Sequence, residues 1–361
     1  MEEADRTGAP WVTFALLAVL VAVFGVELGA GERTQFLQPG IRTLVSLGGL
    51  SRNLVLGNGD WFRLFAAPFL HASPLHLLLN GLVLLWGGTI LERLVGRAWF
   101  AAIYAVSGIA GSLMSLAVNP PNVVSVGASG ALMGVMASLF VASFHFPAGP
   151  LRARLRVAAL QVLVPSMIPV FTAVTGQAVD YGAHAGGALG GAVTALLMLL
   201  LWRRTGVLPR LRPLAAAIGL AAFAAAAASA WKVGHNVALQ AALVPDAEFP
   251  RSDADWKAKA KDLTAHYPHD PRVRLFNGIA RLDADDRDGA ERELRTGLAD
   301  AVALKGVLRP QVEALLRTNL ATAILPDKPA EALVVAEPVC RTDTEETRGL
   351  RSRLKRSGLC D

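Results

Sequence analysis

The chain of 361 residues is rich in apolar side chains, which make up 53% of it, and poor in charged ones, at 18%. Soluble domains average about 25% charged residues, so part of this chain is expected to lie in a membrane. Residues 1–240 carry a net charge of +7 and residues 241–361 a net charge of −1, which together give +6. The positive excess flanks apolar segments and has no basic, aromatic-interleaved patch, so we expect no nucleic-acid partner.

Seven apolar segments are long enough to cross about 30 Å of hydrocarbon, which takes roughly 20 helical residues. They are expected near residues 11–30, 75–92, 98–118, 127–146, 155–175, 182–202 and 213–232. The first segment follows Glu2, Glu3 and Asp5 instead of positive charge, which argues against a secretory signal. The seventh has eleven alanines between residues 215 and 230 and could instead be a soluble helix. The chain is therefore predicted to be all-α, a polytopic membrane bundle of six helices plus this seventh.

The arginines predict how the segments cross the membrane. They gather in alternate connections, at residues 93–97, 152–156 and 203–212, and the positive-inside rule makes that side cytoplasmic. The starts of the fourth and sixth segments then lie toward the outer face. If the seventh segment crosses, residues 240–361 are extracytoplasmic. The connection between the first two segments does not fit this pattern, because it also holds four arginines.

That first connection, from about Gly31 to Pro74, is long enough to be either functional or disordered. Its Leu, Val, Trp and Phe residues favour a loop embedded in the membrane surface, and a partly disordered connector is the alternative. The second apolar segment then carries His76 and Asn80, which lie one turn apart on the same helix face. Both can donate hydrogen bonds, either to join helices or to form an oxyanion hole.

A serine and a histidine stand among small residues in later segments. Ser129 belongs to Gly127-Ala128-Ser129-Gly130, and taken alone it is most simply a residue of a close helix crossing. His184, in Ala183-His184-Ala185-Gly186-Gly187, is an ionisable group inside an apolar segment and is harder to explain by packing. Glycine-rich helices can approach closely, which would bring this base within reach of the serine hydroxyl. Asp180, one turn before His184, is a weak candidate for an acidic third member.

The ordered set of these motifs resembles the rhomboid intramembrane serine proteases over about residues 10–205. Further matching segments are Asp60-Trp61-Phe62-Arg63, Phe69-Leu70-His71 and Leu91-Glu92-Arg93 before Gly96. The resemblance implies a dyad of Ser129 as nucleophile and His184 as general base. It also implies an oxyanion hole of His76, Asn80 and the backbone N–H of Ser129. Two positions depart from the family pattern: Met133 replaces an aromatic residue expected to stack on the histidine, and Tyr181-Gly182 replaces the one before Ala-His.

The resemblance also implies the substrates and surroundings of the protein. Transmembrane segments of other proteins would enter sideways near the fifth helix and be cleaved near their outer ends, within the lipid bilayer of a bacterial inner membrane. The alternative is an inactive member that binds or escorts membrane helices. A solute transporter is disfavoured, because charge is scarce within the segments. No His-Glu-x-x-His pattern occurs, so we expect no metal and no cofactor.

Residues 240–361 read as a soluble helical domain. Apolar residues repeat at helical spacing in pairs of helices that resemble degenerate tetratricopeptide repeats, with a generic helical domain as the alternative. Such a domain could bind a protein partner. Cys340 and Cys360 could form a disulfide in an oxidising compartment or remain as two thiols. We thus expect a tail over 1–10, a membrane core over 11–205, a linker and seventh helix over 206–239, and this domain over 240–361.

Overall fold

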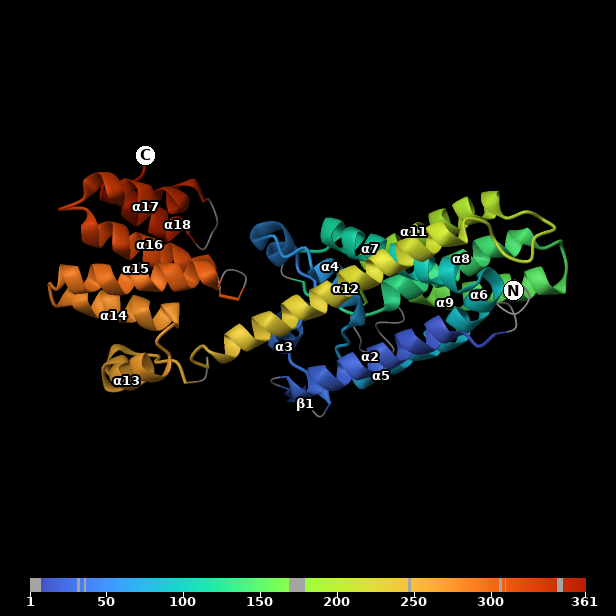
Figure 1. Ribbon diagram of the computed structural model, residues 1–361, viewed down its shortest axis with the longest axis horizontal. Coiled ribbons are helices and arrows are strands. Elements are labelled where there is room, and N and C mark those ends of the chain that lie inside the picture. Colours follow the sequence, from blue (N-terminus) through green and yellow to red (C-terminus); the bar gives the residue numbers. More distant parts are fainter. Residues whose placement is uncertain are drawn as a thin grey trace. The chain divides into compact units, whose positions relative to one another are not determined.

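The computed structural model describes residues 8–30, 33–35, 37–121, 123–168, 179–245, 248–304, 307–308, 310–342 and 347–361. Helices dominate these residues (Figure 1), with one antiparallel pair of short strands, β1 (Arg33–Gln35) and β2 (Gln38–Pro39). The chain divides into two compact units, Met1–Gly234 and His235–Asp361. The predicted all-α class is confirmed.

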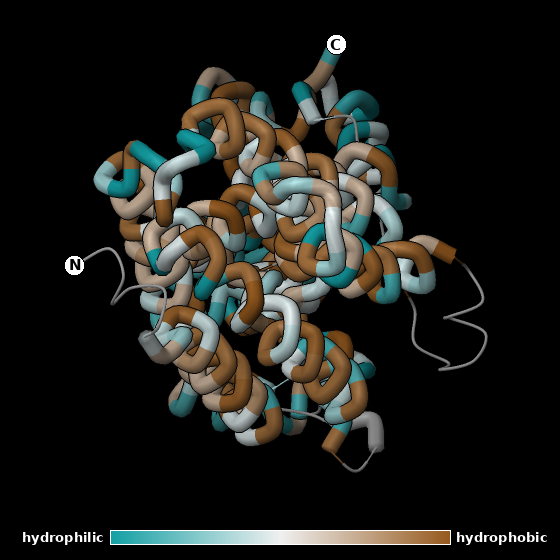
Figure 2. Tube along the Cα trace, turned by 90° about the vertical axis from the view of Figure 1, so that its right-hand side faces the viewer, coloured by the Kyte–Doolittle hydropathy of each residue, from teal (hydrophilic) through white to brown (hydrophobic). Residues whose placement is uncertain are grey.

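The first unit is built from long apolar helices. They are α2 (Trp11–Gly29), α5 (Pro74–Val83) continued by a π-helical turn (Leu84–Gly88) and α6 (Thr89–Val95), α7 (Arg97–Val118), α8 (Ser129–Ala142), α9 (Pro150–Ser166), α11 (Tyr181–Leu201) and α12 (Arg212–Ala241). In the described residues, five helical segments are long and apolar enough to cross a membrane: α2, Pro74–Val95, α7, α11 and α12. The segment Ser129–His145 is apolar but shorter. Hydrophobic residues, drawn in brown, make up much of the tube in Figure 2.

The predicted fifth segment, residues 155–175, only partly overlaps the described chain. Helix α9 begins earlier, with Pro150 in its first turn, and it ends at Ser166. Proline is favoured at that position because its missing N–H would have no helical partner there. Residues 169–175 of the predicted segment lie outside the described residues.

Glycines let α8 and α11 pack backbone against backbone. A Cβ added at Gly187 would lie 1.9 Å from the carbonyl oxygen of Gly130, and one added at Gly191 would lie 2.2 Å from that of Gly134. Side chains at these positions would therefore force the helices apart. The Ser138 hydroxyl adds a hydrogen bond between the same two helices by donating to the Gly191 carbonyl at 2.8 Å. Small residues at such crossings are typical of membrane bundles.

The arginine-bearing connections meet at one end of the first unit. Trp99, at the start of α7, donates from its indole to the carbonyl of Arg210, just before α12, at 2.8 Å. Arg204, after α11, donates to the carbonyl of Phe144, after α8, at 2.9 Å. Because α8 and α11 both end here, their first turns lie at the opposite end of the unit.

The connection between α2 and α5 is packed over its described residues. It contains β1, β2, α3 (Ile41–Ser46), a π-helical turn (Asn53–Gly57), α4 (Arg63–Ala66) and a 3-10 turn (Ala67–Phe69). Arg63 is only 4% exposed and joins the pieces: it pairs with Asp60 at 3.1 Å and donates to the carbonyls of Val45 and Gly49 at 2.7 and 3.0 Å. The described part is therefore an ordered structure that packs on the helices.

The second unit is a stack of short amphipathic helices around its own apolar core. They are α13 (Asp253–His266), α14 (Pro271–Asp283), α15 (Arg287–Ala303), α16 (Pro310–Ile324), α17 (Pro329–Arg341) and α18 (Arg348–Arg356). From α14 to α17, each helix packs on the next one along the chain. The core between them includes Leu294, Leu316 and Leu320, each 1% exposed or less.

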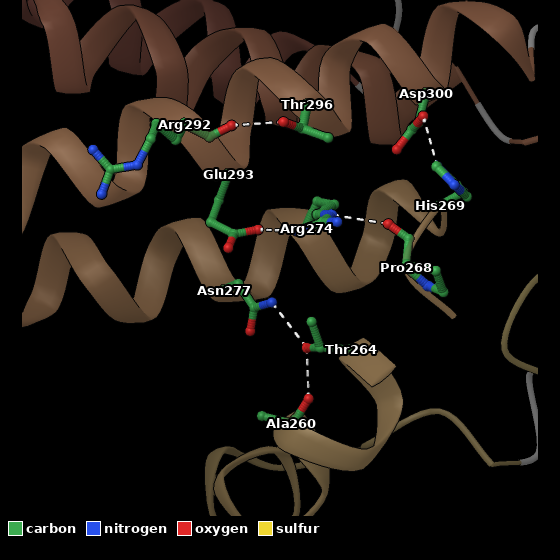
Figure 3. A network of polar contacts seen from close by, with 10 residues as sticks. All are labelled: Ala260, Thr264, Pro268, His269, Arg274, Asn277, Arg292, Glu293, Thr296 and Asp300. Atoms are coloured by element: carbon green, nitrogen blue, oxygen red, sulfur yellow. Dashed lines mark hydrogen bonds and ion pairs between the residues drawn. The ribbon is translucent and has the colours of Figure 1, made fainter. Parts of the chain in front are cut away.

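Polar contacts and a disulfide reinforce this second unit. Asn277 donates to the Thr264 hydroxyl at 3.0 Å, and Arg274 pairs with Glu293 at 2.8 Å (Figure 3). Cys340, in α17, is bonded to Cys360, after α18, with their Cα atoms 5.6 Å apart. The last helix is thereby held on the stack. Of the two alternatives that the sequence left open, the structure contains the disulfide.

Candidate active site

Ser129 is the first residue of α8, and the chain before it needs glycine. Gly127 has a φ of +122°, a backbone conformation that side chains disfavour. A Cβ added there would lie 2.6 Å from Cε1 and 2.7 Å from Nε2 of His76, and 3.6 Å from Nδ2 of Asn80. The imidazole and the carboxamide therefore lie against the backbone two residues before Ser129. The Gly127 N–H donates to the carbonyl of Ala67 at 3.0 Å, which fixes this segment on the first connection.

His184 lies in the first turn of α11 and is only 6% exposed. Its Nδ1 is 2.9 Å from the carbonyl oxygen of Ser166, at the end of α9. A carbonyl oxygen can only accept, so Nδ1 carries the hydrogen, and in the neutral ring Nε2 is left with its lone pair. The Tyr181 ring lies beside the imidazole, with ring centroids 6.5 Å apart in an edge-on arrangement.

The residues next to Ser129 and His184 are in backbone contact. A Cβ added at Gly130 would lie 3.0 Å from the carbonyl oxygen of Ala183. The first turns of α8 and α11 therefore touch, one residue away from each of the two side chains. Within the described part of the chain, the Ser129 hydroxyl is not hydrogen-bonded to His184. Catalytic hydrogen bonds are often long without substrate, and the two helix starts are already in contact here.

Asp180 makes its hydrogen bonds away from His184. It caps α11 by accepting from the Ala183 N–H at 2.8 Å, and it also accepts from the hydroxyls of Ser115 and Ser125 at 2.6 and 2.5 Å. Burial alone would raise the pKa of Asp180, but these hydrogen bonds outweigh it and lower the pKa below its usual value. The carboxylate stays ionised and holds α7, the chain before α8 and the start of α11 together.

Asn80 is oriented by a residue that sequence reasoning did not place in the site. His71 is fully buried, and its Nε2 lies 3.0 Å from Nδ2 of Asn80. Sequence reasoning noted His71 only as part of a matching segment. Glu27, which accepts from the His71 backbone, was missed entirely, although it is the one acidic residue of the first apolar segment. An ionisable residue inside a membrane segment was the signal that could have drawn attention to it.

Met133 lies in the buried core of the first unit and is 3% exposed. The position where an aromatic ring was expected to stack on His184 is thus occupied by an apolar side chain that packs into this core. The ring recorded beside His184 comes instead from Tyr181, one turn earlier on the same helix. His184 therefore has an aromatic neighbour, and that neighbour is Tyr181 and not the residue at position 133.

The helices and this site define the class: an integral membrane protein that crosses the bilayer several times. Residues 58–201 match the family model of the rhomboid domain. This part of the chain is therefore similar to the rhomboid domain, in agreement with the resemblance that the motifs indicated. The four candidate residues at positions 76, 80, 129 and 184 all lie inside the matched range.

Curated relatives agree with this family. The chain is 29% identical over 187 residues to the rhomboid protease GluP of Bacillus subtilis, covering 52% of this chain and 34% of the relative. It is 42% identical over 83 residues to the putative rhomboid protease YdcA of the same organism, covering 23% and 42%. It is 36% identical over 172 residues to rhomboid-like protease 5 of Toxoplasma gondii, covering 46% and 20%. The chain thus spans less than half the length of each of these relatives.

Proposed function

We propose that the protein is an intramembrane serine endopeptidase in which Ser129 is the nucleophile and His184 its general base. The observation that supports this most is the backbone contact of Gly130 with Ala183, which joins the two helix starts beside these side chains. A packing role alone would not require an imidazole at that contact. The Ser166 carbonyl gives a further reason, because it holds the ring with Nε2 free to accept a proton.

The proposed reaction follows from these groups. The Ser129 hydroxyl attacks the scissile carbonyl carbon while Nε2 of His184 takes its proton. The tetrahedral oxyanion is held by the Ser129 N–H, the His76 ring and the Asn80 amide, and each such donor is worth about 3–4 kcal/mol in the transition state. The imidazolium then gives its proton to the leaving amine. A water molecule, activated by the same base, releases the acyl group from the serine.

The substrates we propose are transmembrane segments of other proteins, reached within the bilayer. With the arginine end of the first unit cytoplasmic, the first turns of α8 and α11 face the outer side, so cleavage falls near the outer ends of those segments. Helix α12 then crosses outward and puts residues 240–361 on the extracytoplasmic side of a bacterial inner membrane. We assign 11–205 to the protease core, 206–239 to a linker and seventh helix, and 240–361 to a domain that binds a protein partner.

Activity is tested with a fluorophosphonate probe and a model transmembrane substrate, on the protein in membranes. Ser129→Ala should abolish both labelling and cleavage, and His184→Ala should block labelling of Ser129. Ser138→Ala is the matched control on the same helix, because its buried hydroxyl faces Gly191, and it should still be labelled. Wild-type protein that is neither labelled nor able to cleave would instead favour an inactive rhomboid-like protein that binds or escorts membrane helices. Cleavage that persists in Ser129→Ala would contradict the role of Ser129 as nucleophile.

Topology is tested by a reporter fused after Cys360. An extracytoplasmic signal supports the proposed crossing by α12, whereas a cytoplasmic signal contradicts it.

A further inference from the structure

Glu27 is a buried acid that the proposed reaction does not use. It lies near the end of α2, is 0% exposed, and both of its carboxylate oxygens lie 3.1 Å from the backbone nitrogen of His71. Acidic residues inside membrane segments are costly and are retained where they have a task. Glu27 also lies outside residues 58–201, so the match to the rhomboid domain does not account for it.

The residue that Glu27 holds is the partner of Asn80. Nδ1 of His71 is 3.3 Å from the carbonyl of Phe69, which can only accept, so Nδ1 carries the hydrogen. Nε2 must then accept the hydrogen bond from Nδ2 of Asn80, at 3.0 Å. A carboxamide nitrogen has two hydrogens. One is held by His71, which fixes the plane of the amide and leaves the second hydrogen for another acceptor.

The short segment from Ala67 to the start of α5 contacts both the chain before Ser129 and the helix that carries His76 and Asn80. Ala67 accepts from the Gly127 N–H, Ser73 caps α5 by accepting from the His76 N–H at 3.2 Å, and His71 lies between them. A carboxylate bound to the His71 N–H therefore fixes the one segment that positions Asn80, His76 and the chain before Ser129.

We propose that Glu27 is a positioning residue for the Asn80 donor of the oxyanion hole, acting through His71. This inference rests on the proposed protease function. Without the carboxylate, the buried His71 N–H loses its acceptor and the segment shifts, so the imidazole no longer holds the Asn80 amide in place. The loss falls on the transition state, where the oxyanion forms, and substrate binding is little changed.

The first test compares two substitutions of Glu27 in the full-length protein, with steady-state cleavage of a model transmembrane substrate. Glu27→Leu should lower kcat about 10-fold with KM within about twofold, less than the 100-fold or more expected for removing an oxyanion donor itself. Glu27→Gln keeps an oxygen acceptor for the His71 N–H and should stay within about twofold of wild type. Wild-type kcat in folded Glu27→Leu protein, or an equal loss in both variants, overturns the inference.

The second test asks whether the loss passes through Asn80. In an Asn80→Ala background, Glu27→Leu should cost nothing further, because the donor that it positions is already gone. The matched control is Thr13→Val, which removes a buried 2.7 Å hydrogen bond to Glu92 near the other end of α2. Any loss that it causes should be the same factor in both backgrounds. If Glu27→Leu behaves like this control, Glu27 has only a structural role and the inference fails.

A third variant keeps the inference testable if Glu27→Leu does not fold. His71→Phe retains the backbone N–H that Glu27 binds but lacks the ring acceptor for Asn80, so it should lower kcat and be silent in the Asn80→Ala background. Undiminished kcat would overturn the role of His71 and with it that of Glu27. A wild-type protein that neither cleaves nor is labelled would show that the proposed function itself has failed, a result distinct from wild-type activity with an unaffected Glu27→Leu variant.

Discussion

The contact between α8 and α11 predicts a large effect of a single methyl group at Gly187. A Cβ there would lie 1.9 Å from the Gly130 carbonyl oxygen, whereas the tightest ordinary contacts begin near 3.4 Å. To restore such a contact, the helices have to part by about 1.5 Å. Overpacking of this kind costs about 1–3 kcal/mol, and we expect Gly187→Ala to lie at the upper end of that range because the clash is with backbone.

The same separation should impair catalysis. Gly130 is next to Ser129, and α11 carries His184, so a shift of about 1 Å between nucleophile and base should slow the reaction about 100-fold. Fluorophosphonate labelling rates and thermal unfolding in detergent measure the two effects. Gly25→Ala on α2 is the control, because a Cβ there meets nothing within 4 Å, and it should change neither. A Gly187→Ala protein with wild-type labelling rate and unfolding temperature would refute the packing argument.

Three other changes test the framework around the site. Arg63→Ala leaves the Asp60 carboxylate buried without its cation and should lower the free energy of unfolding by about 3–5 kcal/mol, measured by thermal or denaturant unfolding; wild-type stability would contradict it. Cys360→Ser removes the disulfide to Cys340, which lies 20 residues earlier, and should destabilise the second unit by about 3 kcal/mol. The measurement is proteolysis of the full-length chain under non-reducing conditions, which should become faster; an unchanged proteolysis rate would contradict the prediction. Asp180, with its lowered folded pKa, contributes stability above its unfolded pKa that is lost as pH falls below about 4, so Asp180→Asn should flatten the acid limb of stability against pH; an identical acid limb would count against it.

The sequence was most informative where one residue type or one local spacing carries the information. Apolar length predicted the helices of the first unit, and the spacing of four put His76 and Asn80 on one helix face. Glycine next to Ser129 and His184 indicated a close crossing, because only small residues allow it. These inferences need no knowledge of which helix packs on which, and the described structure agrees with them.

The remaining contacts depend on tertiary packing and leave no local pattern. The bond from the His71 N–H to Glu27 joins residues 44 apart, and that from Ser115 to Asp180 joins residues 65 apart. From sequence, Asp180 could be considered as an acidic third member only because it lies one turn from His184. The sequence did not indicate that the hydroxyls of Ser115 and Ser125 bind its carboxylate. The disulfide stayed open for the same reason, since two cysteines in sequence do not say whether α17 and the end of the chain meet.

The hydrogen bond from His184 to the Ser166 carbonyl couples the tautomer of the histidine to the position of α9. The Ser166 carbonyl lies in the last turn of α9, and it selects the tautomer in which Nε2 of His184 keeps its lone pair. A substrate helix that pushed the end of α9 aside to reach Ser129 would also remove that carbonyl from Nδ1. The imidazole would then be free to rotate or to change tautomer until α9 returned. On the proposed mechanism, displacement of the end of α9 would therefore take away the acceptor that selects the tautomer of His184.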